Sequence, residues 1–334
     1  MATTMIPPAS APDFLAAHGW DGAEIRPLAG DASFRRYFRV HRGGDTAVLM
    51  DAPPEHEDVE PFLRVSNHLA ARGFPSPRTL AIDRDKGLLL LEDFGDDRVG
   101  RLLEREPARE REIYESAIDT LAEIARDPAP QDIPPYDQDA MAREVDLLTQ
   151  WYAPALDLAV DEAGYRAAWQ RAWADVLKAV EAGPVLVLRD YHAENLMVLP
   201  GRRELGLLDF QDALAGHPAY DLVSLLQDAR RDVDPKLEEA MLRRYYAAAG
   251  VQNPERFRAD YEVLGAQRNS KILGIFTRLW KRDGKPHYLP FQPRVWGYLE
   301  RNLEHPALGS VRNWFDTNIP ADKRAAAWKA DGPR

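Results

Sequence analysis

Three polar residues within six positions are the clearest candidates for chemistry. The stretch VLRDYHAENLMV (187–198) contains Asp190, His192 and Asn195, and Asp209 follows at the end of the apolar run LGLLDF. Amide and carboxylate oxygens suit Mg²⁺, which keeps several waters and takes other ligands from phosphates. A further carboxylate, Asp190, could accept or orient the proton of an attacking hydroxyl. These residue types and spacings predict phosphoryl transfer, which needs positioning and charge neutralisation more than covalent help.

Short strands must bring these residues together. The apolar runs PVLVL, LMVL and LGLLDF lie between residues 185 and 212. A strand–loop–strand hairpin would return the 190–195 loop to the side of Asp209. Around this segment the sequence has helical periodicity and few helix breakers. The expected helices span 107–126, 138–150, 161–182, 219–230, 235–249 and 254–280.

The first ~95 residues have a different sequence pattern, which predicts mostly β-strands. FRRYFRVHRGGDTAVLMDAP has two β-favouring runs around RGGD, which indicates a hairpin. DVEPFLRVSNHLAARGF is helical in spacing and stops at Gly73, and RTLAIDRDKGLLLLEDFGD indicates a second strand pair. The sequence predicts a small β-rich lobe at 1–95, a connector starting near residue 91, and a large helical lobe at 96–334 with the catalytic loop.

Composition limits the classes of function. The chain has 334 residues, of which 45% are hydrophobic and 29% charged, as in globular proteins. A net charge of −11 argues against nucleic-acid binding as the main role. The absence of Cys excludes disulfides and thiolate metal sites. Since neither a signal peptide nor an apolar run of membrane-spanning length is visible, we expect a cytoplasmic protein without membrane association.

The central motifs resemble a known group of kinases. LRDYHAENLMV and LGLLDFQDALAGHPAYDLVSLL are similar to the aminoglycoside phosphotransferase/choline kinase branch of the protein-kinase-like fold. The resemblance implies a bilobal α+β fold that uses ATP and Mg²⁺. It implies that Asp190 is the catalytic carboxylate, that Asn195 and Asp209 bind Mg²⁺, and that Asp221 is structural, capping its helix and bonding backbone amides of the catalytic loop.

Segments outside the centre narrow the resemblance. GDASFRRYFRV, LLLEDFGD, QRNSKILGIFTRL and RVWGYLERNLEHPAL look like the bacterial anomeric N-acetylmuramate/N-acetylglucosamine kinases of peptidoglycan recycling, and the likeness runs from about residue 29 to 308. It implies transfer of a phosphate from ATP to the C1 hydroxyl of a small amino sugar. No nucleic acid, membrane or obligate protein partner is expected.

Two features depart from the kinase pattern. Met50 occupies the position on the third strand where kinases carry a phosphate-binding Lys, and LAGDASFRRYF has one Gly where a Gly-rich loop is expected. If Phe38 and Val40 face the adenine, strand alternation places Arg36 on the same side, toward the phosphates. We therefore expect Arg36, or in second place Arg35, to supply the missing cation.

The remaining candidates surround these groups. The adenine is expected against the connector near Glu92 and Phe94, and Ser33 could either bond a phosphate or shape its turn. His192 has no partner at metal-ligand spacing and is expected to brace the loop. Tryptophans at helical spacing (Trp151, Trp169, Trp173, Trp280 and Trp296) are more simply core residues than sugar platforms.

A cluster of polar side chains interrupts an apolar helix. QRNSKIL contains Gln267, Arg268, Asn269 and Lys271, which form either an acceptor pocket or a solvated face. In the first case Arg268 and Lys271 could meet the lactyl carboxylate of N-acetylmuramate. Two alternatives stay open: a kinase of another small substrate, such as an aminoglycoside or choline, and a nucleotide-binding pseudokinase.

Overall fold

The computed structural model describes residues 5–30, 34–202, 204–324, 328–329 and 332–333. Contacts group the chain into two compact units. The first comprises Met1–Leu102 and Glu194–Asp212, and the second comprises Leu103–Ala193 and Ala213–Arg334. The lobes expected from the sequence, 1–95 and 96–334, are contiguous, whereas this grouping takes residues 194–212 out of the later one.

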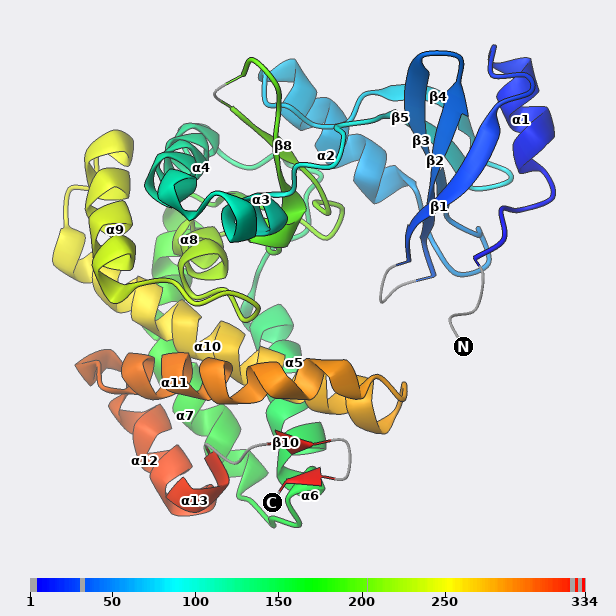
Figure 1. Cartoon of the computed structure of the whole chain (residues 1–334). Coiled ribbons are helices and arrows are strands. Elements are labelled where there is room, and N and C mark those ends of the chain that lie inside the picture. Colours follow the sequence, from blue (N-terminus) through cyan, green and yellow to red (C-terminus); the bar gives the residue numbers. More distant parts are fainter. Residues whose placement is uncertain (1–4, 31–33, 203, 325–327, 330–331, 334) are drawn as a thin grey trace. The chain divides into compact units, whose positions relative to one another are not determined.

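A five-stranded antiparallel sheet is the centre of the first unit (Figure 1). Its strands follow the order β1-β2-β3-β5-β4, and a two-stranded hairpin, β7–β8, belongs to the same unit. The elements are α1 (Ala11–Ala17), β1 (Glu24–Gly30), β2 (Arg36–Arg42), β3 (Asp45–Asp51), α2 (Glu60–Ala71), β4 (Thr79–Asp83), β5 (Leu88–Glu92), β7 (Leu196–Val198) and β8 (Leu205–Leu207). Helix α3 (Val99–Arg105) begins in this unit and continues into the second.

The two faces of the sheet bury different side chains. Because successive residues of a strand point to opposite faces, Phe38 and Val40 of β2 share a face with Leu49 of β3. These residues pack with Phe14 and Leu15 of α1 in one core cluster. The other face carries Tyr37, Val48 and Leu91, which line a pocket. Phe38 and Val40 therefore face this core, and the condition under which Arg36 was expected to point toward the phosphates is not met.

The second unit is mostly helical. Its long helices are amphipathic, and α10 contacts α5, α8 and α11. Two short strands, β6 (Val185–Val187) and β9 (Leu214–Gly216), pair with each other and flank the segment 188–213 in the sequence. The helices are α4 (Glu110–Ile124), α5 (Gln138–Leu147), α6 (Ala153–Ala155), α7 (Glu162–Ala182), α8 (Ala219–Leu226), α9 (Pro235–Ala249), α10 (Pro254–Lys281), α11 (Gln292–Leu303), α12 (Gly309–Asn318) and α13 (Ala321–Arg324), and β10 (Trp328–Lys329) pairs with β11 (Gly332–Pro333).

Short turns of other helical types join these elements. A π-helical turn, Leu148–Tyr152, continues α5, which explains why the expected helix at 138–150 is longer than the α-helix itself. The 3₁₀ turns are Pro107–Arg109, Ala193–Asn195, Pro286–Phe291 and Pro306–Leu308. Within the described residues, every helix is too short or too polar to span a membrane.

Large aromatic side chains fill the core of the second unit. Trp169 and Trp173 on α7 stack with ring centroids 5.5 Å apart, and Trp296 on α11 is equally buried. The Nε1 of Trp296 donates a hydrogen bond of 2.6 Å to the Tyr152 hydroxyl. The core prediction is confirmed for these three tryptophans, while Trp151 and Trp280 are half-buried.

The crossing of α10 over the end of α5 requires a glycine. A Cβ atom added at Gly274 would lie 2.4 Å from the carbonyl carbon of Leu147 and 2.5 Å from its oxygen. These are backbone atoms and cannot move aside as a flexible side chain can. Gly274 therefore permits the close approach of the two helices.

Gly274→Ala should lower the free energy of unfolding by about 1–3 kcal/mol, because overpacking forces the helices apart. Gly297→Ala in α11 is the matched control, since nothing lies within 4 Å of the added Cβ. The control should leave stability unchanged or raise it by up to about 1 kcal/mol through helix propensity. Urea unfolding followed by circular dichroism measures both, and equal midpoints would contradict the close approach.

Candidate nucleotide pocket and catalytic loop

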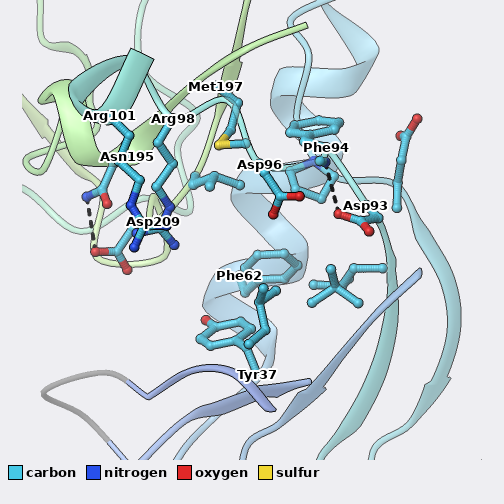
Figure 2. Close-up of a pocket in the computed structure, with 17 residues that line it drawn as sticks. Tyr37, Phe62, Asp93, Phe94, Asp96, Arg98, Arg101, Asn195, Met197 and Asp209 are labelled. Atoms are coloured by element: carbon cyan, nitrogen blue, oxygen red, sulfur yellow. Dashed lines mark hydrogen bonds between the residues drawn. The ribbon is translucent and has the colours of Figure 1, made fainter. Parts of the chain in front are cut away.

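A pocket in the first unit gathers residues from many separate segments of the chain (Figure 2). One part is apolar and is formed by the sheet, by α2 and by β7. The other part is polar and is formed by the connector, the start of α3 and the ends of the β7–β8 hairpin. The lining residues are Leu28, Tyr37, Val48, Phe62, Pro77, Leu91, Glu92, Asp93, Phe94, Gly95, Asp96, Arg98, Arg101, Asn195, Met197, Leu208 and Asp209.

Arg39 holds the connector in place. Its Nε lies 2.8 Å from Oδ2 of Asp93, and its terminal nitrogens lie 2.7 Å from Oδ1 of Asp96 and 2.9 Å from the Gly95 carbonyl. Gly95 has a φ of 82°, a conformation that favours glycine. The predicted adenine contacts, Glu92 and Phe94, therefore lie in or next to a segment fixed by one guanidinium. No local sequence pattern indicates this role of Arg39, because its partners are more than fifty residues away.

Glu92 and Phe94 both line the pocket. The Glu92 carboxylate accepts a 3.0 Å bond from Nε of Arg78, and the Glu92 amide bonds the Arg78 carbonyl at 2.9 Å. The Phe94 ring lies over Gly206 of β8, where an added Cβ would be 2.7 Å from Cδ2. Gly206 thus leaves room for the ring against the hairpin.

The hairpin brings Asn195 and Asp209 together. Leu196 of β7 pairs with Leu207 of β8, so the residue before one strand and the residue shortly after the other meet at one end. Nδ2 of Asn195 donates a 3.2 Å bond to Oδ2 of Asp209 (Figure 2). Oδ1 of Asp209 accepts a 2.7 Å bond from Nε2 of Gln211. Both residues line the pocket.

The backbone around Asp209 is also constrained. Asp209 has a φ of 58°, which is uncommon for a residue other than glycine. The next residue, Phe210, is fully buried and stacks on Phe62 of α2 with ring centroids 5.1 Å apart. Burial of Phe210 fixes the chain on one side of Asp209, and the Leu208 amide bonds the Asn195 carbonyl on the other at 3.0 Å.

The candidate catalytic segment of the second unit, which contains Asp190, is held by Asp221. Its carboxylate accepts hydrogen bonds from the backbone amides of Leu188 at 2.7 Å and Arg189 at 2.8 Å. Arg189 has a φ of 69°, so these bonds hold a rare backbone conformation next to Asp190. Burial raises the pKa of Asp221 to about 7, although the two amides act in the opposite direction. Asp221 lies in the first turn of α8, whose N-cap residue is Pro218, so Asp221 is not the residue at the cap position.

The Asp190 carboxylate is accessible and lies in a positive environment. Its side chain is 41% exposed, and Oδ1 lies 3.7 Å from a terminal nitrogen of Arg268. Burial would raise the pKa of Asp190, but the charges of Lys271 and Arg268 outweigh it and hold the pKa below its usual value. Asp190 is therefore ionised at neutral pH, as a group that accepts or orients a proton must be.

His192 is buried and lies against Arg230, with 3.3 Å between Nε2 and a terminal nitrogen of the arginine. Burial lowers the pKa of His192 to about 4, so the ring is neutral at physiological pH. A buried neutral ring with a fixed neighbour suits the expected role of bracing the loop.

A buried carboxylate that the sequence analysis missed supports this region. Oε1 of Glu144 on α5 accepts bonds from a terminal nitrogen of Arg189 at 2.5 Å and from Nζ of Lys271 at 2.7 Å. Its Oε2 accepts a bond from the Tyr136 hydroxyl. Burial raises the pKa of Glu144, but Lys271 and Arg189 together lower it to about 2. Only the fold brings these partners together, so no local signal marks Glu144.

The polar cluster on α10 is buried, and the solvated alternative is wrong. Gln267 and Asn269 are fully buried, and Gln267 donates to the Tyr136 hydroxyl at 2.6 Å. Asn269 donates to Gln227 at 2.8 Å and to Asn302 at 3.0 Å. Arg268, the neighbour of Asp190, also donates to the Ser224 hydroxyl at 2.8 Å.

The arginines expected to bind phosphate are held in ion pairs. Nε of Arg36 donates a 2.7 Å bond to Asp51, and Nε of Arg35 lies 3.7 Å from Glu57. The face of β2 that lines the pocket carries Tyr37. Arg36 lies on the opposite face of the strand, so strand alternation does not direct it toward the phosphates. Ser33 lies outside the described residues. The assignment of phosphate to Arg35 or Arg36 remains a prediction.

Met50 lies where the sequence analysis placed the missing lysine. It is two residues after Val48 on β3, so both point to the pocket face of the sheet, and it pairs with Tyr37 of β2. Its side chain is fully buried. This position therefore contributes no positive charge to the pocket.

The family of the chain follows from its similarity to known proteins. A family model described as the phosphotransferase enzyme family matches residues 24–259. The chain belongs to this family. It is an ATP-dependent kinase with a small-molecule substrate, and the predicted family and bilobal α+β fold are confirmed.

Two curated relatives are similar over most of their length. The N-acetylmuramate/N-acetylglucosamine kinase of Caulobacter vibrioides is 38% identical over 93% of this chain and 96% of its own. The protein of the same name from Pseudomonas aeruginosa is 39% identical over 86% of this chain and 87% of its own.

Solved structures show the same fold at lower identity. A choline/ethanolamine kinase family protein from Mesorhizobium loti gives a TM-score of 0.58 at 18% identity and covers 91% of this chain and 98% of its own. Aminoglycoside phosphotransferase APH(3'')-Id from Streptomyces rimosus, in complex with ADP and streptomycin, gives a TM-score of 0.54 at 18% identity. The match covers 78% of this chain and 99% of that protein's chain.

The charge environment of Asp190 gives a testable titration. Arg268→Gln should raise the pKa of the Asp190 carboxyl, because it removes the positive charge 3.7 Å away. Carboxyl-carbon NMR of ¹³C-labelled protein between pH 2.5 and 7 measures the shift, and Asp190→Asn assigns the resonance. Arg256 pairs with Asp260 and Asp175. Arg256→Gln is therefore the control and should leave the titration of Asp190 unchanged. Identical curves for the wild type and Arg268→Gln would contradict the assigned electrostatics.

Proposed function

We propose that the protein transfers the γ-phosphate of ATP to the anomeric C1 hydroxyl of N-acetylmuramate, N-acetylglucosamine or both. One observation carries the choice of sugar. Four curated relatives that are 37–39% identical over at least 82% of this chain are all named N-acetylmuramate/N-acetylglucosamine kinase. The choice of C1, the role in peptidoglycan recycling and the cytoplasmic location rest on the resemblance of the sequence motifs.

The pocket of the first unit suits the nucleotide. Its apolar walls, such as Val48 and Leu91, fit a purine ring, and the connector backbone from Glu92 to Phe94 offers hydrogen-bonding groups to the ring edge. Asn195 and Asp209 lie at the polar part of the same pocket. The phosphates would therefore lie toward these two residues.

Asn195 and Asp209 are suitable ligands for Mg²⁺. Both offer oxygen atoms, and Mg²⁺ prefers such donors together with waters and phosphate oxygens. Among the described residues, no group of three His, Cys, Asp or Glu side chains could hold a metal, so further ligands would come from phosphate and water. When bound, the ion supplies charge neutralisation at the phosphates.

Asp190 is the proposed catalytic carboxylate. As the C1 oxygen attacks the γ-phosphorus and ADP leaves, the hydroxyl proton passes to the ionised Asp190. An anomeric hydroxyl is more acidic than an ordinary sugar alcohol, so a carboxylate of low pKa suffices as the acceptor. Arg268 and Lys271, both near Asp190, would place positive charge beside an acidic sugar such as N-acetylmuramate. Gln267 and Asn269 would act behind them through their buried hydrogen bonds.

The reaction can be followed directly by NMR with ATP, Mg²⁺ and either sugar labelled with ¹³C at C1. We expect a C1–O–P coupling and loss of the free anomeric signals. Choline and a panel of aminoglycosides, which are the alternative acceptors, should stay unmodified. Phosphate on another carbon, or transfer to choline or an aminoglycoside in place of the sugars, would contradict the proposal. ATP binding without transfer to any acceptor would support a pseudokinase.

Asp190→Ala should lower kcat by about 10²–10⁴-fold, the range for loss of a general base. Asp175→Ala is the control, because Asp175 is an exposed aspartate on α7 and should leave turnover unchanged. A coupled ADP-release assay with N-acetylmuramate measures both variants. Near wild-type turnover of Asp190→Ala would exclude its catalytic role.

Asp209→Asn should raise the Mg²⁺ concentration needed for half-maximal activity at least about tenfold, since the ligand loses its charge. Asp85→Asn, in the turn between β4 and β5, keeps the same chemistry outside the pocket and should leave the requirement unchanged. The assay is run across a Mg²⁺ series at fixed ATP. An unchanged Mg²⁺ requirement for Asp209→Asn would rule it out as a ligand.

A further inference from the structure

Two arginines at the start of α3 line the nucleotide pocket. Arg98 immediately precedes α3, and Arg101 lies three residues later, a spacing that places two side chains on the same side of a helix. Both line the pocket that also contains Asn195 and Asp209. Figure 2 shows both guanidinium groups directed toward the end of the pocket where Asn195 and Asp209 lie. Neither arginine stood out in the sequence.

Backbone bonds tie the start of α3 to the hairpin that carries Asn195. The Val198 amide bonds the Asp97 carbonyl at 2.8 Å, and Arg98 forms an isolated antiparallel bridge with Met197 of β7. The next residue, Val99, is buried and anchors the helix. The positions of the two arginines are therefore coupled to the strand that begins directly after Asn195.

The charges of these arginines are available to a ligand. Arg101 is exposed, and within the described part of the chain it has no ion pair. A terminal nitrogen of Arg98 lies 4.0 Å from the Glu194 carboxylate, and both side chains are about one-third exposed. An exposed pair at this distance contributes little, so a phosphate can replace it. By contrast, Arg39 lies within 2.8 Å of Asp93 and is committed to the connector.

The pocket needs positive charge from somewhere other than β3. The lysine position holds the buried, apolar Met50, and Arg36 is bonded to Asp51. The triphosphate of ATP carries several negative charges, and Asp209 adds another beside it. Guanidinium groups suit this environment because each can donate two parallel hydrogen bonds to phosphate oxygens.

We propose that Arg98 and Arg101 bind the phosphates of ATP and replace the β3 lysine of other kinases. This rests on the proposed function for the nucleotide, but not on the identity of the sugar. The arginines approach the phosphates from the connector side of the pocket, and the positions of Val48 and Met50 on the face of β3 stay apolar. The positive charge thereby comes from the segment that is bonded to the Asn195 hairpin.

Nucleotide binding to the full-length chain without acceptor tests this. Calorimetry measures the affinities for ADP and ATP. Ligand-observed NMR titration measures the affinity for adenosine, which has the base and ribose but no phosphate. Arg98→Ala and Arg101→Ala should each lower the affinity for ADP and ATP about tenfold or more, because each variant loses a charge-assisted hydrogen bond to phosphate. Adenosine affinity should stay within about twofold of the wild type. Lysine at either position should restore part of the loss, because it keeps the charge.

Arg105→Ala is the matched control, because Arg105 ends the same helix but does not line the pocket. It should bind all three ligands like the wild type. Unchanged ADP and ATP affinity in the double alanine variant would overturn the proposal, and so would an equal loss for adenosine, which indicates damage to the fold. If the wild type itself failed to bind ATP, the proposed function would fail instead.

Discussion

The pairing of Leu196 with Leu207 is the contact on which the candidate site of the first unit depends. This register places Asn195 and Asp209 at one end of the hairpin, 3.2 Å apart between Nδ2 and Oδ2. A slip by one residue would turn every side chain to the other face and separate the two. The Phe94 ring packs against Gly206 of the same hairpin, and the Val198 amide bonds the Asp97 carbonyl just before α3. The hairpin thus fixes the proposed metal ligands, the proposed adenine contact and the two arginines together.

The second unit positions Asp190 by burying charge. Glu144 bonds Arg189 and Lys271, and burial of such a group is costly unless every partner is present. The arrangement keeps Arg189 and Lys271 fixed beside a carboxylate that must itself stay accessible. Asp221 adds a second fixed anchor through two backbone amides. A reactive group on a loop becomes well placed because its neighbours cannot move without leaving a buried charge unpaired.

What the sequence predicted well depends on local chemistry. The β7–β8 hairpin follows from short apolar runs with a fixed separation, so Asn195 and Asp209 were placed correctly beside one another. Helices α7, α9 and α10 follow from their period and caps, and their observed bounds lie within one residue of the expected ones. Helix α11 was missed, although its segment RVWGYLERNL has apolar residues at helical spacing.

Errors arose where only tertiary packing decides. Alternation shows that Phe38 and Val40 share a face, but the packing of α1 decides that this face is the core. Charge composition did not show that Gln267 and Asn269 are buried, because their hydrogen-bond partners, Tyr136, Gln227 and Asn302, come from distant segments. The roles of Arg39 at the connector and of Glu144 beside Arg189 were not predicted for the same reason.

Met50 shows how a missing charge reshapes a site. A lysine on β3 would need a partner carboxylate to stay charged while buried, since desolvation disfavours its charged form. Met50 is uncharged and has no such requirement. Elsewhere in the same unit, Phe62 of α2 stacks on Phe210. That stack fixes the chain directly after Asp209. In the proposed arrangement, positive charge on the half-buried Arg98 and the exposed Arg101 would avoid the desolvation cost, because an arginine there keeps its hydration until phosphate binds.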